Sequence, residues 1–213
     1  MRKIITLISF IITSLIAQAT HIRCGHISLI RIDGLTYQIT LNVYTNSGSE
    51  IKFGDGVLDF GDGTTPHITA TTENTLRPDL GPNIATVVYS INHTYPGPGN
   101  YVITYGENNL SGGIINITNS VETKFYLETQ ISLDANTDCS SPEFLVVPFF
   151  KQLVGNEYNF STAAIDNNDY KLTYELVNPL EPGNLNFSIP ENININNYNG
   201  LVIWDTKHNC TYQ

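Results

Sequence analysis

Asp59-Phe60-Gly61-Asp62-Gly63-Thr64, together with the later segment 93–104 (HTYPGPGNYVIT), decides how this chain folds. Glycine adopts positive φ without strain, and an aspartate carboxylate accepts hydrogen bonds from nearby backbone N–H groups, so Gly-Asp-Gly predicts a tight turn. Residues 96–99 (PGPG) predict a second turn. The residues that follow it, 101–107, alternate apolar with polar, as a half-buried strand does. The two segments therefore predict turns and strands of an antiparallel β structure.

The same alternation recurs along the chain. It is clearest in residues 35–44 (LTYQITLNVY), where Leu35, Tyr37, Ile39, Leu41 and Val43 are predicted to share one buried face. Further strands are predicted at residues 26–32, 57–60, 85–95, 114–117, 122–133, 157–160, 172–177 and 201–204, with a strand and a turn in the Asn-rich stretch 192–199. Short strands at this spacing, without crossover helices, predict an all-β fold of β-sandwiches.

The charge balance bears on the partners. The chain has 20 Asp and Glu against 10 Lys and Arg, a formal net charge of −10, and no cluster of basic residues after residue 3. Such a protein is poorly suited to nucleic acid or to anionic membranes, so neither is predicted as a partner. Solubility accounts for the acidity most simply, and cation binding is the alternative.

The N-terminus has the organisation of an export signal. A short basic region at residues 1–3 precedes an apolar run at residues 4–16, and Ala17-Gln18-Ala19 has the small-x-small pattern of a cleavage site. The run is short for a bilayer span. Residues 1–19 are therefore predicted to be a signal peptide, and the mature chain to begin at Thr20, to be secreted or bound at the cell surface, and to have no stable membrane span. A retained N-terminal anchor is the alternative.

Three cysteines, Cys24, Cys139 and Cys210, remain in the mature chain. Export permits disulfides, but an odd number leaves one thiol over, and the pairing stays open. The absence of a C-x-x-C pattern argues against a zinc or redox site.

The two segments quoted first resemble the PKD (polycystic-kidney-disease) domain family. That family pairs a W/F-x-F-G-D-G-T hairpin with a downstream H-x-Y…P-G-x-Y-x-V segment on neighbouring strands. Leu58 stands where the family usually has an aromatic residue. The resemblance covers about residues 53–133 and implies an immunoglobulin-like β-sandwich over residues 20–134, including N-terminal strands. It implies a structural role, in the hairpin and its packing, for the matching residues Asp59, Phe60, Gly61, Asp62, Gly63, His93, Tyr95, Pro98, Gly99 and Tyr101.

Residues 135–142 are predicted to be a linker, and residues 143–213 a second, incomplete β-sandwich. Residues 164–176 (AIDNNDYKLTYEL) and 200–204 (GLVIW) resemble a dystroglycan- or cadherin-type module. Such modules often bind calcium at domain junctions, which implies a calcium site at Asp166, Asn167 and Asp169. A turn capped by these side chains is the alternative. Asp55, Asp59 and Asp62 form a second, weaker calcium candidate, because they lack EF-hand spacing.

The wider arrangement resembles large surface proteins of the Bacteroidetes type, linked to gliding motility or adhesion. The features that carry this resemblance are Thr20-His21-Ile22-Arg23, the strand at residues 35–44, the repeated Phe-Gly-Asp-Gly at residues 53–56 and 60–63, and Ser141-Pro142. This implies a non-catalytic structural or adhesive module that contacts other surface proteins or glycans. The alternative is a carbohydrate-binding accessory module that uses exposed aromatic side chains, for which the candidates are Tyr44, Tyr89, Tyr105, Tyr198 and Trp204. The sequence has no G-x-S-x-G, phosphate loop or H-E-x-x-H, so no enzyme is predicted, and no cofactor other than calcium.

Overall fold

The structure is a computed structural model that describes residues 22–49, 53–68, 75–108, 110–134, 138–151 and 153–207. In these residues the regular structure consists of β-strands and one short 3-10 helix, η1 (Ser120–Glu122). The predicted all-β class is therefore confirmed. The predicted signal peptide, the mature N-terminus at Thr20 and Cys210 lie outside the described residues.

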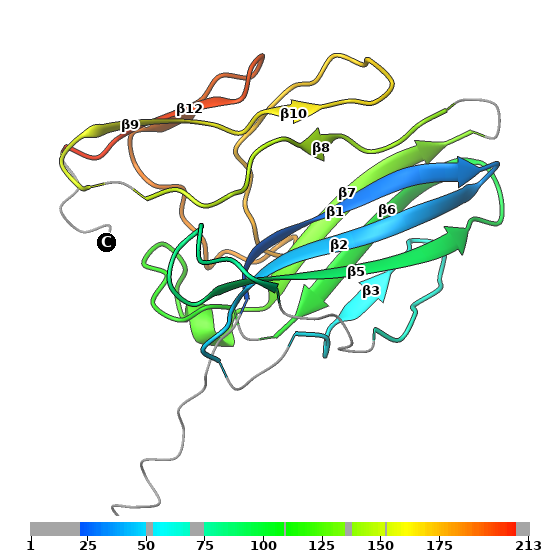
Figure 1. The fold of residues 1–213 in the computed structure, drawn as a ribbon, viewed down its shortest axis with the longest axis horizontal. Coiled ribbons are helices and arrows are strands. Elements are labelled where there is room, and N and C mark those ends of the chain that lie inside the picture. Colours follow the sequence, from blue (N-terminus) through cyan, green and yellow to red (C-terminus); the bar gives the residue numbers. More distant parts are fainter. Residues whose placement is uncertain are drawn as a thin grey trace, which may run out of the picture.

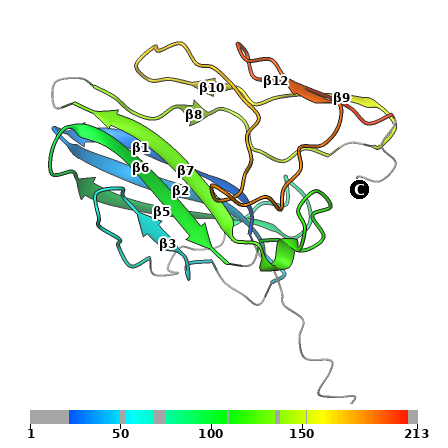
Figure 2. The same ribbon diagram turned by 180° about the vertical axis from the view of Figure 1, so that it is seen from behind.

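Two antiparallel sheets pack face to face and form a β-sandwich (Figures 1 and 2). The first sheet has the order β1-β2-β5-β4 and contains β1 (Ile22–Asp33), β2 (Thr36–Asn46), β4 (Thr75–Leu76) and β5 (Ile84–Thr94). The second has the order β3-β6-β7 and contains β3 (Val57–Asp59), β6 (Gly99–Glu107) and β7 (Phe125–Leu133). Strand β4 is a short addition that is not among the predicted strands.

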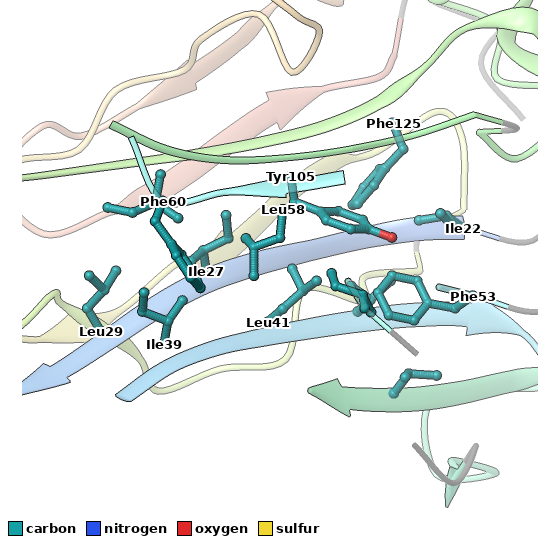
Figure 3. Packing of buried hydrophobic residues seen from close by; sticks show 14 of the residues in the cluster. Ile22, Ile27, Leu29, Ile39, Leu41, Phe53, Leu58, Phe60, Tyr105 and Phe125 are labelled. Atoms are coloured by element: carbon teal, nitrogen blue, oxygen red, sulfur yellow. The ribbon is translucent and has the colours of Figure 1, made fainter. Parts of the chain in front are cut away.

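The core lies between these sheets because β2 alternates as its sequence predicts. Tyr37, Ile39, Leu41 and Val43 have no exposed surface. Figure 3 shows Leu58, Phe60 and Tyr105 from the opposite layer facing apolar residues of β1 and β2. Removing such apolar surface from water contributes about 25 cal/mol per Å² and is the main term that holds the sheets together.

A second group of strands lies to one side of the sandwich (Figures 1 and 2). Strands β8 (Glu143–Phe144) and β10 (Ala164–Ile165) pair, and a three-stranded sheet has the order β11-β12-β9, with β9 (Glu157–Ser161), β11 (Ile193–Ile195) and β12 (Leu201–Asp205). From residue 138 onward, Leu180 and Val202 are the buried apolar residues of the described chain. This group therefore has little core of its own.

Two expected strands are absent from the described chain. Residues 114–117 form a turn, in which the Ile117 N–H donates to the Ile114 carbonyl at 3.2 Å, and Ile117 makes a single bridge with Phe187. Residues 172–177 have the alternating burial of a strand but no ladder partner, and in this stretch Tyr174 makes one backbone bond, to the Asn197 carbonyl at 3.0 Å. Alternation of apolar and polar residues indicates which face is buried, whereas a β-strand also requires a neighbouring strand for its backbone hydrogen bonds.

Backbone hydrogen bonds fasten the second group to the sandwich in two regions. On the open edge of β1, the Ser141 N–H donates to the Leu29 carbonyl at 2.9 Å, and the Leu29 N–H donates to Ser141 Oγ at 2.8 Å. Far from this edge contact in sequence, the Thr118 N–H donates to the Asn186 carbonyl at 2.8 Å. We call these two contacts the junction. Two separate attachments restrict rotation between the parts more than one would.

Candidate functional site

The Gly-Asp-Gly hairpin after β3 is closed by its own side chains. Asp59 Oδ1 accepts a hydrogen bond from the Gly61 N–H at 2.7 Å, and Asp62 Oδ1 accepts from the Thr64 N–H at 3.0 Å and the Thr64 hydroxyl at 2.6 Å. Gly61 has a φ of 81°, and a Cβ there would lie 2.5 Å from the Val102 carbonyl oxygen. Glycine is thus required for two independent reasons.

His93 joins the two halves of the motif. Its Nε2 lies 2.7 Å from Asp62 Oδ2, and its ring stacks on Phe60 with centroids 4.1 Å apart. Burial alone would raise the pKa of Asp62, but the hydrogen bonds from Thr64 and His93 outweigh it and hold that pKa below its ordinary value. The pair is inside the protein, since the Asp62 side chain is only 4% exposed.

The remaining motif residues continue this packing. The buried Tyr95 hydroxyl donates to the Phe60 carbonyl at 3.3 Å, and the Tyr95 and Tyr101 rings lie 4.3 Å apart. Tyr101 donates in turn to the Gly97 carbonyl at 2.9 Å, across the turn that contains Pro98 and leads into β6 at Gly99. The structure thus brings the two quoted segments together, and their polar groups are engaged in turn and packing contacts.

Sequence reasoning missed a buried acidic residue. Glu107 is 4% exposed, and its Oε2 accepts a very short hydrogen bond from the Tyr105 hydroxyl and one of 3.3 Å from the Gly54 N–H. Burial, followed by the neighbouring carboxylate, raises the pKa of Tyr105. The signal was present in the sequence, because Glu107 occupies the inward register of Ile103 and Tyr105 on β6.

The acidic turn predicted as a calcium site is capped by the side chain of Asp166. Asp166 Oδ1 accepts from the N–H groups of Asn168 at 2.8 Å and Tyr170 at 3.4 Å, and Asp169 has a φ of 61°. Asn167 is exposed, and Asn168 Oδ1 accepts from the Ser140 N–H at 3.1 Å. Within the described chain no three His, Cys, Asp or Glu side chains converge as metal ligands would. Calcium at Asp166, Asn167 and Asp169 stays a prediction.

The two described cysteines are free thiols that lie far apart. Cys139 precedes Ser140, whose Oγ accepts from the Arg31 N–H, whereas Cys24 lies seven positions before Arg31 on β1. At about 3.3 Å per residue this is roughly 23 Å, and a disulfide needs Cα atoms roughly 4.4–6.8 Å apart. Cys24 and Cys139 are therefore not paired with each other. Burial raises the pKa of Cys24 to about 12.

A cleft of about 770 Å³ opens over the sheet β11-β12-β9. We call it the apolar cleft. Phe150, Tyr158, Phe160 and Trp204 provide its aromatic walls, and Ile114 and Ile115 reach it from the first sandwich. Phe150 packs on Phe160 with ring centroids 4.1 Å apart.

The five aromatic residues considered for sugar stacking have different surroundings. Tyr44 and Tyr105 are buried, so an external sugar cannot stack on them, and Tyr89 packs against the core. Tyr198 is 68% exposed, and the Lys171 ammonium lies 5.1 Å from its ring centroid. Of the five, Trp204 lines the apolar cleft.

Comparison with protein-family models, curated proteins and solved structures gives no match for this chain. Among the described residues, no helix has the length and apolar character that crossing a bilayer requires.

Proposed function

We propose that this chain is an exported, non-catalytic surface protein that acts as a structural and adhesive module. The observation that carries the proposal is the junction. It holds the second group of strands at a fixed position beside the sandwich, through Ser141 on the edge of β1 and through the bond between Thr118 and Asn186. A rigid support with an open apolar cleft suits contact with another surface molecule better than it suits chemistry.

The proposed class of the first sandwich is a PKD-type, immunoglobulin-like domain, and that of the second group is a partial cadherin-like domain. The first assignment is supported by the contact between Asp62 and His93, which links the hairpin and the downstream segment that the PKD signature pairs. By this assignment the chain belongs with surface proteins of the Bacteroidetes type that serve adhesion or gliding motility.

Localisation and attachment test this proposal in the native host. Antibody labelling of intact cells is expected to detect the protein, and its N-terminal residue is expected to be Thr20. Deletion of the gene is expected to reduce attachment of cells to a surface. A cytoplasmic protein that retains residues 1–19, or unchanged attachment after deletion, would contradict the proposal.

A second candidate function is carbohydrate binding. It is favoured by the aromatic side chains of the apolar cleft, since aromatic rings stack on sugar faces, and Trp204 is the single tryptophan of the chain. A glycan array tests it with Trp204→Ala and, as a control, with Tyr170→Ala, an exposed aromatic residue outside the cleft. Binding that is lost only in Trp204→Ala would favour the carbohydrate-binding function over protein contact.

A further inference from the structure

The sheet β11-β12-β9 has one apolar face. Trp204 lies directly opposite Tyr158 on β9 and Ile193 on β11, and Val202 lies opposite Phe160 and Ile195. Residues directly opposite in a sheet share a face, so these six side chains all point to one side. The other side is mixed, because it carries Glu157, Asn159 and Asp205 together with the partly exposed Leu201 and Ile203.

This face is only partly covered. Phe150 and residues of the loop 113–116 pack over it and leave the apolar cleft of about 770 Å³. Leu153 and Val154 on the rim are 79% and 40% exposed. A contiguous apolar opening of this kind marks an interaction site more often than a solvated surface.

Strand β11 gives the opening a second property, because it forms one edge of the sheet. The Asp205 N–H donates to the Asn192 carbonyl and the Asn196 N–H to the Leu201 carbonyl, which fixes the alternation of the ladder. By that alternation the backbone groups of Ile193 and Ile195 point away from β12. In the described chain they make no backbone hydrogen bond on that side. An open edge beside an apolar face is what an added β-strand requires.

Charge selects among possible occupants. Residues 138–207 contain nine acidic and three basic side chains, and the whole chain has a net charge of −10. A second copy would bring the same net acidic charge and be repelled, whereas a strand with basic flanks would be attracted. The charged side chain in the lining of the cleft is Lys151, so this attraction acts on flanks that extend beyond the cleft.

We propose that the apolar cleft binds an extended segment of another polypeptide, which adds to the free edge of β11. Its alternate apolar side chains enter the cleft, and Lys or Arg residues flank them. This inference rests on the proposed contact function and names the chemistry of the partner.

Trp204 makes the proposal measurable, because the chain's one tryptophan lines the cleft. The probe is a synthetic ten-residue peptide in which Val or Ile alternates with Thr between terminal Lys pairs. Titration into the full mature chain is expected to shift the Trp204 emission to shorter wavelength with saturation. A scrambled peptide of the same composition is expected to bind at least about tenfold more weakly, a difference of about 1.4 kcal/mol.

Two exposed leucines give a matched pair of variants. Leu153→Lys adds a charge on the cleft rim, and Leu185→Lys adds the same charge at a site 90% exposed and outside the cleft lining. We expect Leu153→Lys to lower the affinity for the peptide by about tenfold or more, and Leu185→Lys to leave that affinity within about twofold of the parent value. Both sites are exposed, so neither variant removes core packing.

Each other outcome overturns the proposal. The absence of a saturable emission shift with the peptide would exclude strand binding. Equal binding of the scrambled peptide, or an equal loss of affinity in both variants, would show that the cleft does not recognise an alternating strand. A wavelength shift that depends on protein concentration, with a dimer in sedimentation, identifies a second copy as the occupant. A shift with oligosaccharides alone identifies a sugar site. All these results leave the localisation and attachment tests of the proposed function unaffected.

Discussion

The Nε2 atom of His93 lies 2.7 Å from Oδ2 of Asp62, and this contact joins the hairpin after β3 to the end of β5. The two residues are 31 positions apart in the chain, and the strands beside them, β3 and β5, belong to different sheets of the sandwich. The contact therefore fixes one end of the sandwich, with Phe60 stacked on the imidazole.

Asp62→Asn is expected to lower the free energy of unfolding at pH 7 by about 1–3 kcal/mol, because the neutral amide keeps one acceptor oxygen but loses the charge and the second acceptor that Thr64 and His93 bind. The pKa of Asp62 is held below its ordinary value of 3.8. Its stabilisation is thus fully present above that value and disappears as the pH falls through the lower pKa of the folded state.

Urea unfolding at pH 7 and below pH 3.8 measures both effects. Asp79→Asn, in the exposed pair with Arg77, is the control and is expected to leave the midpoint unchanged. An equal loss at both pH values would contradict this account.

Tyr105→Phe is expected to lower the free energy of unfolding by about 1–3 kcal/mol, because the buried Glu107 carboxylate loses a hydrogen-bond donor. The matched control is Tyr126→Phe, since Tyr126 also donates to the acidic residue two positions on, Glu128, but at the surface. The control is expected to change thermal stability little. If both variants melt at the same temperature as the parent, the burial of Glu107 has no energetic consequence and the account of this pair is wrong.

Ser141→Ala is expected to loosen the junction without unfolding the sandwich. The Leu29 N–H loses the hydroxyl that accepts its hydrogen bond, so its hydrogen exchange should accelerate by about tenfold. Ser132→Ala, on the exposed side of β7, is the control and should leave Leu29 unchanged. Exchange at Leu29 that is identical in both variants would show that the linker does not protect the edge of β1.

Asp166→Ala tests whether the acidic turn is a cap or an ion site. Loss of the cap to Asn168 and Tyr170 is expected to cost about 1 kcal/mol, by analogy with other side-chain caps, and the loss should be the same in calcium and in EDTA. Thermal unfolding in each condition measures it. A parent protein that gains several degrees in calcium, with the gain absent from Asp166→Ala, would establish the ion site instead.

The sequence predicted the sandwich well because both of its signals are local. Alternation in residues 36–46 depends on burial of one face, and the Gly-Asp-Gly turn depends on Asp62 and Gly61 themselves. Glu107 also follows the alternation of β6. A charged residue at an inward position is not expected to be buried, however, unless a donor such as Tyr105 is known to bind it.

The second group could be predicted less well, because its structure depends on contacts with distant residues. Residues 172–177 alternate as a strand does but have no ladder partner in the part of the chain that the structure describes. Ile117 makes its bridge with Phe187, which is 70 positions away. The apolar cleft was not predicted, because it forms only where β9, β11 and β12 meet the loop 113–116. No local pattern marks such a meeting.

Surface attachment of host cells tests the central claim most directly, namely that this protein acts by contact at a rigidly held surface. Cells that lack the gene are complemented with the parent chain, with Leu153→Lys or with Leu185→Lys. We predict that deletion reduces attachment, that the parent and Leu185→Lys restore it, and that Leu153→Lys does not. Restoration by Leu153→Lys would contradict the role of the apolar cleft alone, whereas attachment that survives deletion would contradict the adhesive function itself.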